Sequence, residues 1–166
     1  MVEIRTAERR DVPEIAEFFR VIVADGETYA YPEPLSDDDV ERLWLEPPLA
    51  HAIVAVDDSG VIVGTAKMGP NRPGRGSHVG TASFMVDARA GTRGVGRTMA
   101  EWVIDWHERD GFAAIQFNAV VETNHRAVAL WQSLGFTIVG TVPGAFRSRT
   151  HGMVGLHVMH LRLPRA

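Results

Sequence analysis

The sequence predicts a single α/β domain in which a mixed, mostly antiparallel sheet of about seven strands is flanked by about four helices. Early in the chain, two β-branched runs flank a tight turn, which is typical of a hairpin. Later, apolar strands alternate with segments whose apolar residues recur at helical spacing. The 166 residues contain no internal repeat and no linker, so we expect one domain over residues 1–166.

Each element follows from its local pattern. Asp11 is an N-cap candidate with Pro13 in the next turn, and Ser36 with Asp39 forms a capping-box pattern. The turn "DDSG" divides the hairpin, and "GPNRPGRGSH" is rich in loop residues. In order, we expect a strand at 2–5, helices at 11–25 and 36–45, a hairpin at 51–68, a loop at 69–78, a strand at 78–86, a helix at 94–109, a strand at 113–121, a helix at 124–134, and strands at 136–142 and 153–163.

Composition excludes several classes of function. A formal net charge of -4 and a pI near 6.0 argue against nucleic-acid binding, which needs a basic face. The absence of cysteine excludes disulfides, thiolate metal sites and a cysteine nucleophile. The N-terminus is charged and lacks an apolar signal region, and no stretch approaches the ~20 apolar residues of a membrane span. We therefore expect a cytoplasmic protein that binds neither membranes nor nucleic acid.

The stretch "RAGTRGVGRTM", residues 89–99, has the glycine density of an anion-binding turn. It lacks the Lys-Ser/Thr pair of a P-loop, and Met99 stands where a dinucleotide fingerprint needs its third glycine. A third interpretation is a pyrophosphate held by the first-turn N–H groups of a helix. A glycine-rich turn with solvated arginines is the alternative.

Two motifs together resemble the GCN5-related N-acetyltransferase superfamily. "VDARAGTRGVG", residues 86–96, is similar to its loop motif Val-x-x-x-x-Arg/Gln-x-x-Gly-x-Gly/Ala, and "NHRAVALWQSLGF", residues 124–136, to its later helix signature. The resemblance implies that acetyl-CoA is the cosubstrate and that the protein forms a homodimer. The cofactor-binding positions it implies are Val86, Asp87, Ala88, Gly91, Thr92, Arg93, Gly94, Val95, Gly96, Arg97, Thr98, Asn124, Ala127 and Trp131.

Two positions depart from the superfamily pattern. Gly91 occupies the Arg/Gln position of the loop motif, which removes one expected pyrophosphate contact unless Arg89 or Arg93 replaces it. Trp131 occupies the helix position that is often tyrosine, the usual candidate for the acid that protonates the leaving thiolate. An indole N–H has no useful acidity, so this role cannot be transferred to Trp131.

A narrower resemblance concerns the acceptor. "PGRGSHV", residues 73–79, and "FNAVVETN", residues 117–124, are similar to fungal acetyltransferases that detoxify proline analogues such as azetidine-2-carboxylate. Paired asparagines line the site in those enzymes, and Asn118 and Asn124 have the matching spacing.

The catalytic candidates are Asn118, Asn124 and Glu122. The resemblance implies that backbone N–H groups, aimed by a β-bulge, polarise the thioester carbonyl where the strand ending at Val86 splays from the strand holding Asn118. An asparagine N–H is a candidate second donor, although Asn124 also occupies an N-cap position. The candidate bases are Glu122, Glu27 and His78. The expected substrate-binding residues are Glu27, Tyr29, His78 and Asn118.

These observations predict an acetyl-CoA-dependent N-acetyltransferase that acts on a small-molecule amine or amino acid by direct transfer in a ternary complex. The second hypothesis is a non-catalytic acyl-CoA-binding sensor on the same scaffold. We expect no metal site, because no two of the seven histidines lie four residues apart on a predicted helix.

Overall fold

The computed structural model of the protein describes residues 2–46 and 51–164. Its helices are α1 (Val12–Asp25), α2 (Asp37–Leu45), α3 (Val95–Arg109) and α4 (His125–Ser133). Its strands are β1 (Val2–Thr6), β2 (His51–Asp57), β3 (Ile62–Pro70), β4 (Val79–Val86), β5 (Ala114–Val121), β6 (Thr137–Ser148) and β7 (Gly152–Arg162). The order of elements is the one that the sequence predicts.

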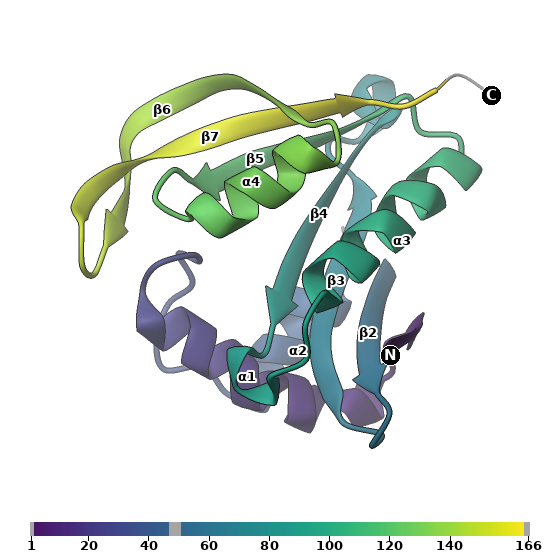
Figure 1. The fold of residues 1–166 in the computed structure, drawn as a ribbon, viewed down its shortest axis with the longest axis vertical. Coiled ribbons are helices and arrows are strands. Elements are labelled where there is room, and N and C mark those ends of the chain that lie inside the picture. The colour runs from purple at the N-terminus through teal and green to yellow at the C-terminus, as the bar shows by residue number, and fades with distance from the viewer. Residues whose placement is uncertain (1, 47–50, 165–166) are drawn as a thin grey trace.

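The seven strands form one sheet in the order β1-β2-β3-β4-β5-β7-β6 (Figure 1). Every neighbouring pair is antiparallel except β4 and β5, which are parallel. The mixed, mostly antiparallel sheet flanked by helices is therefore confirmed. The parallel pairing covers Val79 opposite Ala114 and Gly80 opposite Ile115, and it extends no further.

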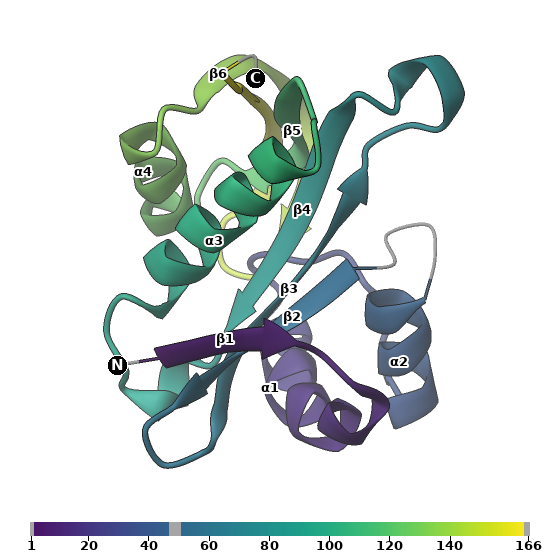
Figure 2. The same cartoon turned by 90° about the vertical axis from the view of Figure 1, so that its right-hand side faces the viewer.

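Helices cover both faces of the sheet (Figure 2). Side chains of a strand point alternately to opposite faces, so each strand contributes to two cores. On β2, Ile53 and Ala55 pack in the core that contains α3, whereas Ala52 and Val54 pack in the core that contains α1 and α2. This two-sided burial fixes the register of the central strands.

The β6–β7 hairpin is longer than the sequence predicts. The expected strand at 136–142 extends as β6 to Ser148, and pairing with β7 continues through Phe146, Arg147 and Ser148 inside the expected loop. Pro143 and Gly144 lie at a register shift between Val142 and Phe146, after which pairing with β7 resumes. These residues therefore mark a bulge and not a strand end, because a bulge tolerates a missing N–H donor. β3 likewise runs to Pro70, inside the predicted loop.

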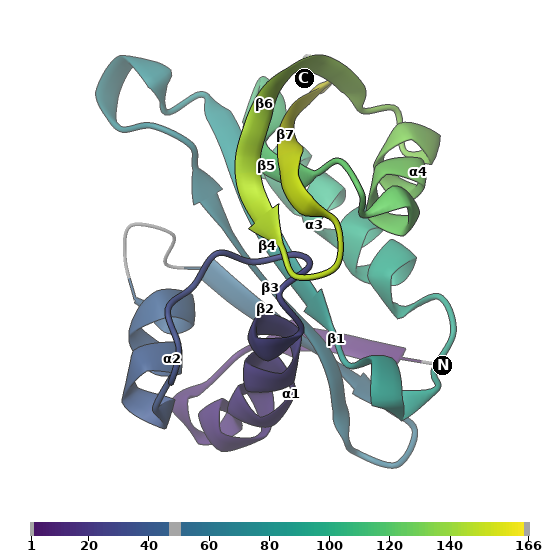
Figure 3. The same cartoon turned by 90° about the vertical axis from the view of Figure 1, so that its left-hand side faces the viewer.

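The tip of this hairpin is attached to the segment that follows α1 (Figure 3). The Ser148 hydroxyl donates to Glu27 Oε2 at 2.6 Å, and the Thr150 N–H donates to Glu27 Oε1 at 2.9 Å. The Arg149 N–H donates to the Gly26 carbonyl at 3.2 Å. These bonds hold the loop between α1 and α2 beside the hairpin.

His107 of α3 makes the stability of the fold dependent on pH. Its side chain is fully buried, and burial lowers the pKa of the imidazole below its usual value near 6.5. The unfolded chain takes up this proton at a higher pH than the folded protein does. The free energy of unfolding should therefore fall as the pH drops from about 7.5 to about 5.5.

Urea denaturation of the wild type and of His107→Phe across this pH range tests the prediction. The variant keeps a ring but cannot be protonated, so its stability should decline less steeply. Equal pH dependence of the two proteins would show that His107 does not contribute.

Candidate active site

A cleft opens where β4 and β5 separate. Beyond Gly80 and Ile115 the two strands diverge (Figure 1), and the space between them is a cleft of about 720 Å³. Residues of β4, β5, α3 and α4 and of the loop between α1 and α2 line it. Separated strands leave main-chain groups without a strand partner, so this cleft can offer hydrogen bonds to a ligand.

The pairing of β4 with β3 determines which main-chain groups face the cleft. The Asp87 N–H donates to the Val63 carbonyl, and the Val79 carbonyl accepts from Asn71. Along a strand, the N–H and C=O groups of successive residues point to opposite edges. Because Val79 and Asp87 bond to the β3 side, the main-chain groups of the odd-numbered residues of β4 face β3. The N–H and C=O groups of Phe84 and Val86 therefore point away from β3, into the cleft.

A bulge of the kind that the resemblance implies is found in β5 and not between β3 and β4. β3 and β4 pair without a register shift from Gly64 opposite Val86 to Pro70 opposite Gly80. The shift occurs instead in β5, between Phe117 and Val120, and it spans Asn118. A bulge at this point bends β5 and re-aims Asn118, because two residues there oppose one residue of β7.

The N-terminus of α3 forms the second wall of the cleft. Gly94 caps the helix in the left-handed conformation, with φ 82°, and no side chain caps the first turn. A Cβ at Gly96 would lie 3.7 Å from Leu130 and 3.8 Å from Val86, which is ordinary contact. The first-turn N–H groups and the helix dipole therefore favour an anion at this end of the cleft.

Charged side chains are few in the cleft. Among the described residues, those that line it are Asp25, Arg97 and Arg126. Arg97 donates to the Ser133 hydroxyl at 2.6 Å and thereby connects α3 to α4. The positive charges lie on α3 and α4, on the side of the helix N-termini.

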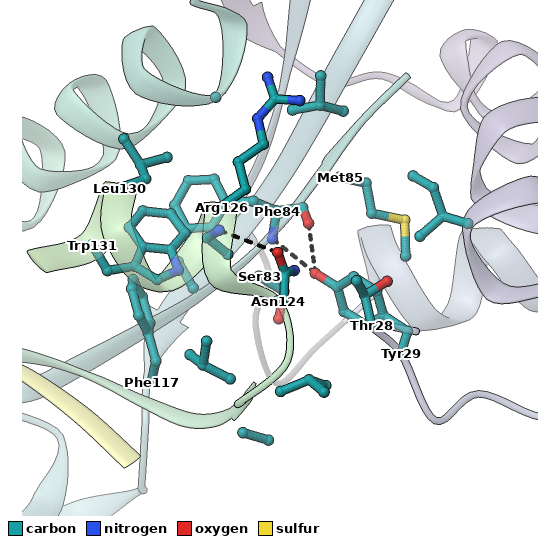
Figure 4. A pocket seen from close by; sticks show the side chains of 18 of the residues that line it. Thr28, Tyr29, Ser83, Phe84, Met85, Phe117, Asn124, Arg126, Leu130 and Trp131 are labelled. Carbon is teal, nitrogen blue, oxygen red and sulfur yellow. Dashed lines mark hydrogen bonds between the residues drawn. The ribbon is translucent and has the colours of Figure 1, made fainter. Parts of the chain in front are cut away.

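An aromatic cluster forms the wall beside α4 (Figure 4). The Trp131 ring lies 4.9 Å from that of Phe84 and 4.7 Å from that of Phe117. Trp131 is only 7% exposed, so most of its surface packs in the core. Asn124 caps α4 by accepting the Ala127 N–H at 3.1 Å, and its side chain also lies in the cleft.

On the opposite side, three amides form a chain. The Asn118 amide donates to Asn71 Oδ1 at 2.7 Å, and Gln116 donates to Asn118 Oδ1 at 2.9 Å. Gln116 and Asn118 lie two residues apart on β5 and share a face, whereas Phe117 between them faces the core that contains α3. This chain of amides therefore lies on the face away from α3.

The loop between α1 and α2 places Tyr29 in the cleft (Figure 4). The Tyr29 hydroxyl donates to the Phe84 carbonyl at 2.6 Å and accepts from the Phe84 N–H at 3.0 Å. Burial raises the pKa of this hydroxyl above its usual value, so it remains protonated at neutral pH.

The structure brings most of the predicted site residues together. Those that line the cleft are Tyr29, Val86, Ala88, Thr92, Gly94, Val95, Gly96, Arg97, Asn118, Asn124, Ala127 and Trp131. Those that do not line it are Glu27, His78, Asp87, Gly91, Arg93, Thr98 and Glu122. Asp87 bonds to Arg89, the suggested replacement for the missing arginine, at 2.8 Å.

None of the three candidate bases lines the cleft, and each lies in a different environment. The Glu122 carboxylate accepts the Gly155 N–H of β7. Glu27 binds the hairpin tip, and its hydrogen bond from Ser148 lowers the pKa of the carboxyl, which makes it a weaker base. His78 is exposed in the turn just before β4, next to the part of β4 that is paired with β5.

Several lining residues were not selected from the sequence. They include Thr28, Phe84, Phe117, Arg126 and Leu130. Phe84 carried a usable signal, because it lies two residues before Val86 on one strand and therefore shares its face. Leu130 belongs to the same apolar face of α4 as Ala127 and Trp131.

No group of three His, Asp or Glu side chains in 2–46 and 51–164 is placed to hold a metal ion. Within the same ranges, no helix combines the length and apolar character needed to cross a bilayer.

A sheet that splays beside a glycine-capped helix N-terminus has a geometry suited to an extended, anionic ligand. The model of the acetyltransferase (GNAT) family matches residues 16–136. The chain therefore belongs to this family.

Known proteins agree with the assignment. The structure of a GCN5-related N-acetyltransferase from Kribbella flavida is 57% identical, with a TM-score of 0.93 and 98% of each chain covered. A phosphinothricin acetyltransferase from Sinorhizobium meliloti, solved in complex with acetyl-CoA, shares the fold at 18% identity, with a TM-score of 0.86, over 98% of this chain and 88% of that one. N-acetyltransferase aca1 of Schizosaccharomyces pombe is 33% identical over 114 residues, 68% of this chain. The chain spans about half the length of that relative, 54%.

Proposed function

We propose that this protein transfers the acetyl group of acetyl-CoA to the amine of a small molecule. The observation that carries the proposal is the cleft between β4 and β5, into which the main-chain groups of Phe84 and Val86 point. Acetyl transfer needs a bound thioester, a polarised carbonyl and an amine placed beside it. Different parts of the cleft meet these three needs.

The end beside α3 suits the pyrophosphate of acetyl-CoA. First-turn N–H groups of α3 lack side-chain caps, and Arg97 and Arg126 add positive charge. Gly96 keeps the helix surface open toward Leu130 and Val86. These residues would hold the cofactor, which supplies the activated acetyl group.

The middle of the cleft suits the reacting thioester. The Phe84 N–H is a donor of the kind that stabilises the developing oxyanion of acyl transfer. The chain has no cysteine, so a cysteine-linked acyl-enzyme is impossible, and direct attack of the amine on the thioester is the simplest route. A thiol with a pKa of about 8.5 can leave without an acid, so Trp131 in place of tyrosine slows the reaction without preventing it.

The other face suits a small acceptor. Asn118, which Asn71 holds in place, offers a neutral hydrogen-bonding group on β5, and Asp25 is the carboxylate that lines the cleft in the described part of the chain. The resemblance of residues 73–79 and 117–124 to acetyltransferases of proline analogues, with the spacing of Asn118 and Asn124, favours a proline analogue or related amino acid. A homodimer and a cytoplasmic location remain predictions.

An acyl-CoA-binding sensor without catalytic activity is the second candidate. It is favoured by Trp131 at the position of the usual acid and by the engagement of Glu27 and Glu122 in structural hydrogen bonds. A sensor of this kind binds acetyl-CoA but transfers nothing.

Release of free thiol from acetyl-CoA across an acceptor panel tests the proposal. The panel contains proline analogues, ordinary amino acids, polyamines, aminoglycosides and short peptides, and the cysteine-free protein gives no thiol background. Release with a small amine supports the enzyme. Acetyl-CoA binding without release from any acceptor would favour the sensor.

Asn118→Ala should lower kcat/KM for the acceptor by about tenfold, the size of one lost hydrogen bond. Its amide faces away from the α3 side, so the Kd of acetyl-CoA should stay within about twofold of the wild type. Steady-state kinetics and calorimetry measure the two quantities. Equal losses in both would indicate damage to the fold and contradict an acceptor role.

A further inference from the structure

The Tyr29 hydroxyl satisfies both main-chain groups that Phe84 directs into the cleft. It donates to the carbonyl at 2.6 Å and accepts from the N–H at 3.0 Å. In a continuous sheet β5 would provide these two bonds, but its pairing with β4 ends at Gly80. A side chain 55 residues away in the sequence therefore takes the place of a neighbouring strand.

This arrangement competes with the thioester for one donor. An N–H group makes one strong hydrogen bond, at a donor–acceptor distance of roughly 2.9 Å. A thioester oxygen held by the Phe84 N–H would need the position that Tyr29 Oη occupies. Both oxygens would act as acceptors for the same proton, so the N–H cannot make a strong hydrogen bond to both at once.

We propose that Tyr29 is a positioning residue, which the thioester carbonyl of acetyl-CoA displaces from the Phe84 N–H. This inference rests on the proposed function. Its consequence is that binding of the acetyl group moves a residue on the acceptor side of the cleft.

The loop around Tyr29 can transmit this displacement. The Tyr29 ring stacks on Tyr31 at 5.6 Å, with the planes 6° apart. Two residues earlier, Glu27 is held by Ser148 and Thr150. Because Thr28 and Ala30 also line the cleft, a shift of Tyr29 reshapes the surface that faces the acceptor.

The test compares acetyl-CoA with CoA, which has no acetyl carbonyl to compete for the N–H. Tyr29→Phe frees the Phe84 N–H, so acetyl-CoA should bind about three- to tenfold more tightly, while the Kd of CoA is unchanged. Tyr31→Phe is the matched control, since no hydrogen bond of its hydroxyl is found among the described residues, and it should change neither Kd.

A second readout uses the unaltered protein. The chain contains two tyrosines, so ring-labelled tyrosine gives two sets of NMR signals, which the two variants assign. The Tyr29 signal should shift with acetyl-CoA and remain in place with CoA.

Three results would overturn the inference. Equal changes of both Kd values in Tyr29→Phe would indicate a structural role. Weaker acetyl-CoA binding and a lower kcat in Tyr29→Phe would identify Tyr29 as a hydrogen-bond donor to the oxyanion. A Tyr29 signal that responds alike to both ligands would exclude displacement by the carbonyl. If neither ligand binds the wild type, the proposed function itself fails.

Discussion

Replacing Gly96 with glutamate should weaken acetyl-CoA binding by about 100-fold or more, because the new carboxylate would face the pyrophosphate at close range. Gly96 lies in the first turn of α3, beside Leu130 and Val86 at the wall of the cleft. An acidic residue in the first turn of a helix is favourable to the helix itself. The thermal midpoint should therefore stay close to that of the wild type while binding is lost.

Gly96→Ala is the matched control. An alanine Cβ would make ordinary contacts of 3.7 and 3.8 Å, so acetyl-CoA should bind nearly as it does to the wild type. Isothermal titration calorimetry on the two variants separates the effect of charge from that of size. Tight binding of acetyl-CoA by Gly96→Glu would place the pyrophosphate away from the N-terminus of α3.

Replacing Gly80 with alanine should lower the free energy of unfolding by about 2–3 kcal/mol, the usual cost of overpacking a core. A Cβ at Gly80 would overlap the imidazole of His107 and lie 3.3 Å from Phe112. His107 is fully buried, so its ring has no open space to enter. Gly80 also forms part of the short pairing between β4 and β5 from which the cleft opens.

Gly140→Ala in β6 provides the control for strand glycines, because nothing lies within 4 Å of its added Cβ. The free energy of unfolding of Gly140→Ala, measured by urea denaturation, should stay close to that of the wild type. In a His107→Ala background, Gly80→Ala should cost less than about 1 kcal/mol, since the two sites are in contact and their effects are not additive. A similar cost in both backgrounds would contradict the steric explanation.

The wall of the cleft beside α3 was largely predictable because its parts are close together in the chain. Val86, at the end of β4, and the first turn of α3 lie within about a dozen residues of the sequence. The groups that favour an anion there are main-chain N–H groups, which helix geometry alone directs. The order of strands and helices was predictable as well, because the apolar periodicity that marks each element is also local in the sequence. Pro143 and Gly144 misled the prediction of β6, since pairing with β7 overrides local signals.

The side of the cleft away from α3 depends on contacts that no local pattern reveals. Tyr29 reaches Phe84 across 55 residues, Asn118 reaches Asn71 across 47, and Glu27 reaches Ser148 across 121. Glu27 was a reasonable candidate base from its position, but its partner lies on a hairpin far along the chain. Only the folded sheet and its β6–β7 hairpin bring these residues together.

A crystal structure of the protein with acetyl-CoA tests the central claim most directly. The account predicts the pyrophosphate at the first-turn N–H groups of α3, the thioester oxygen on the Phe84 N–H, and the Tyr29 hydroxyl displaced from that group. Acetyl-CoA bound outside the cleft between β4 and β5, or with its thioester away from the main chain of β4, would contradict it.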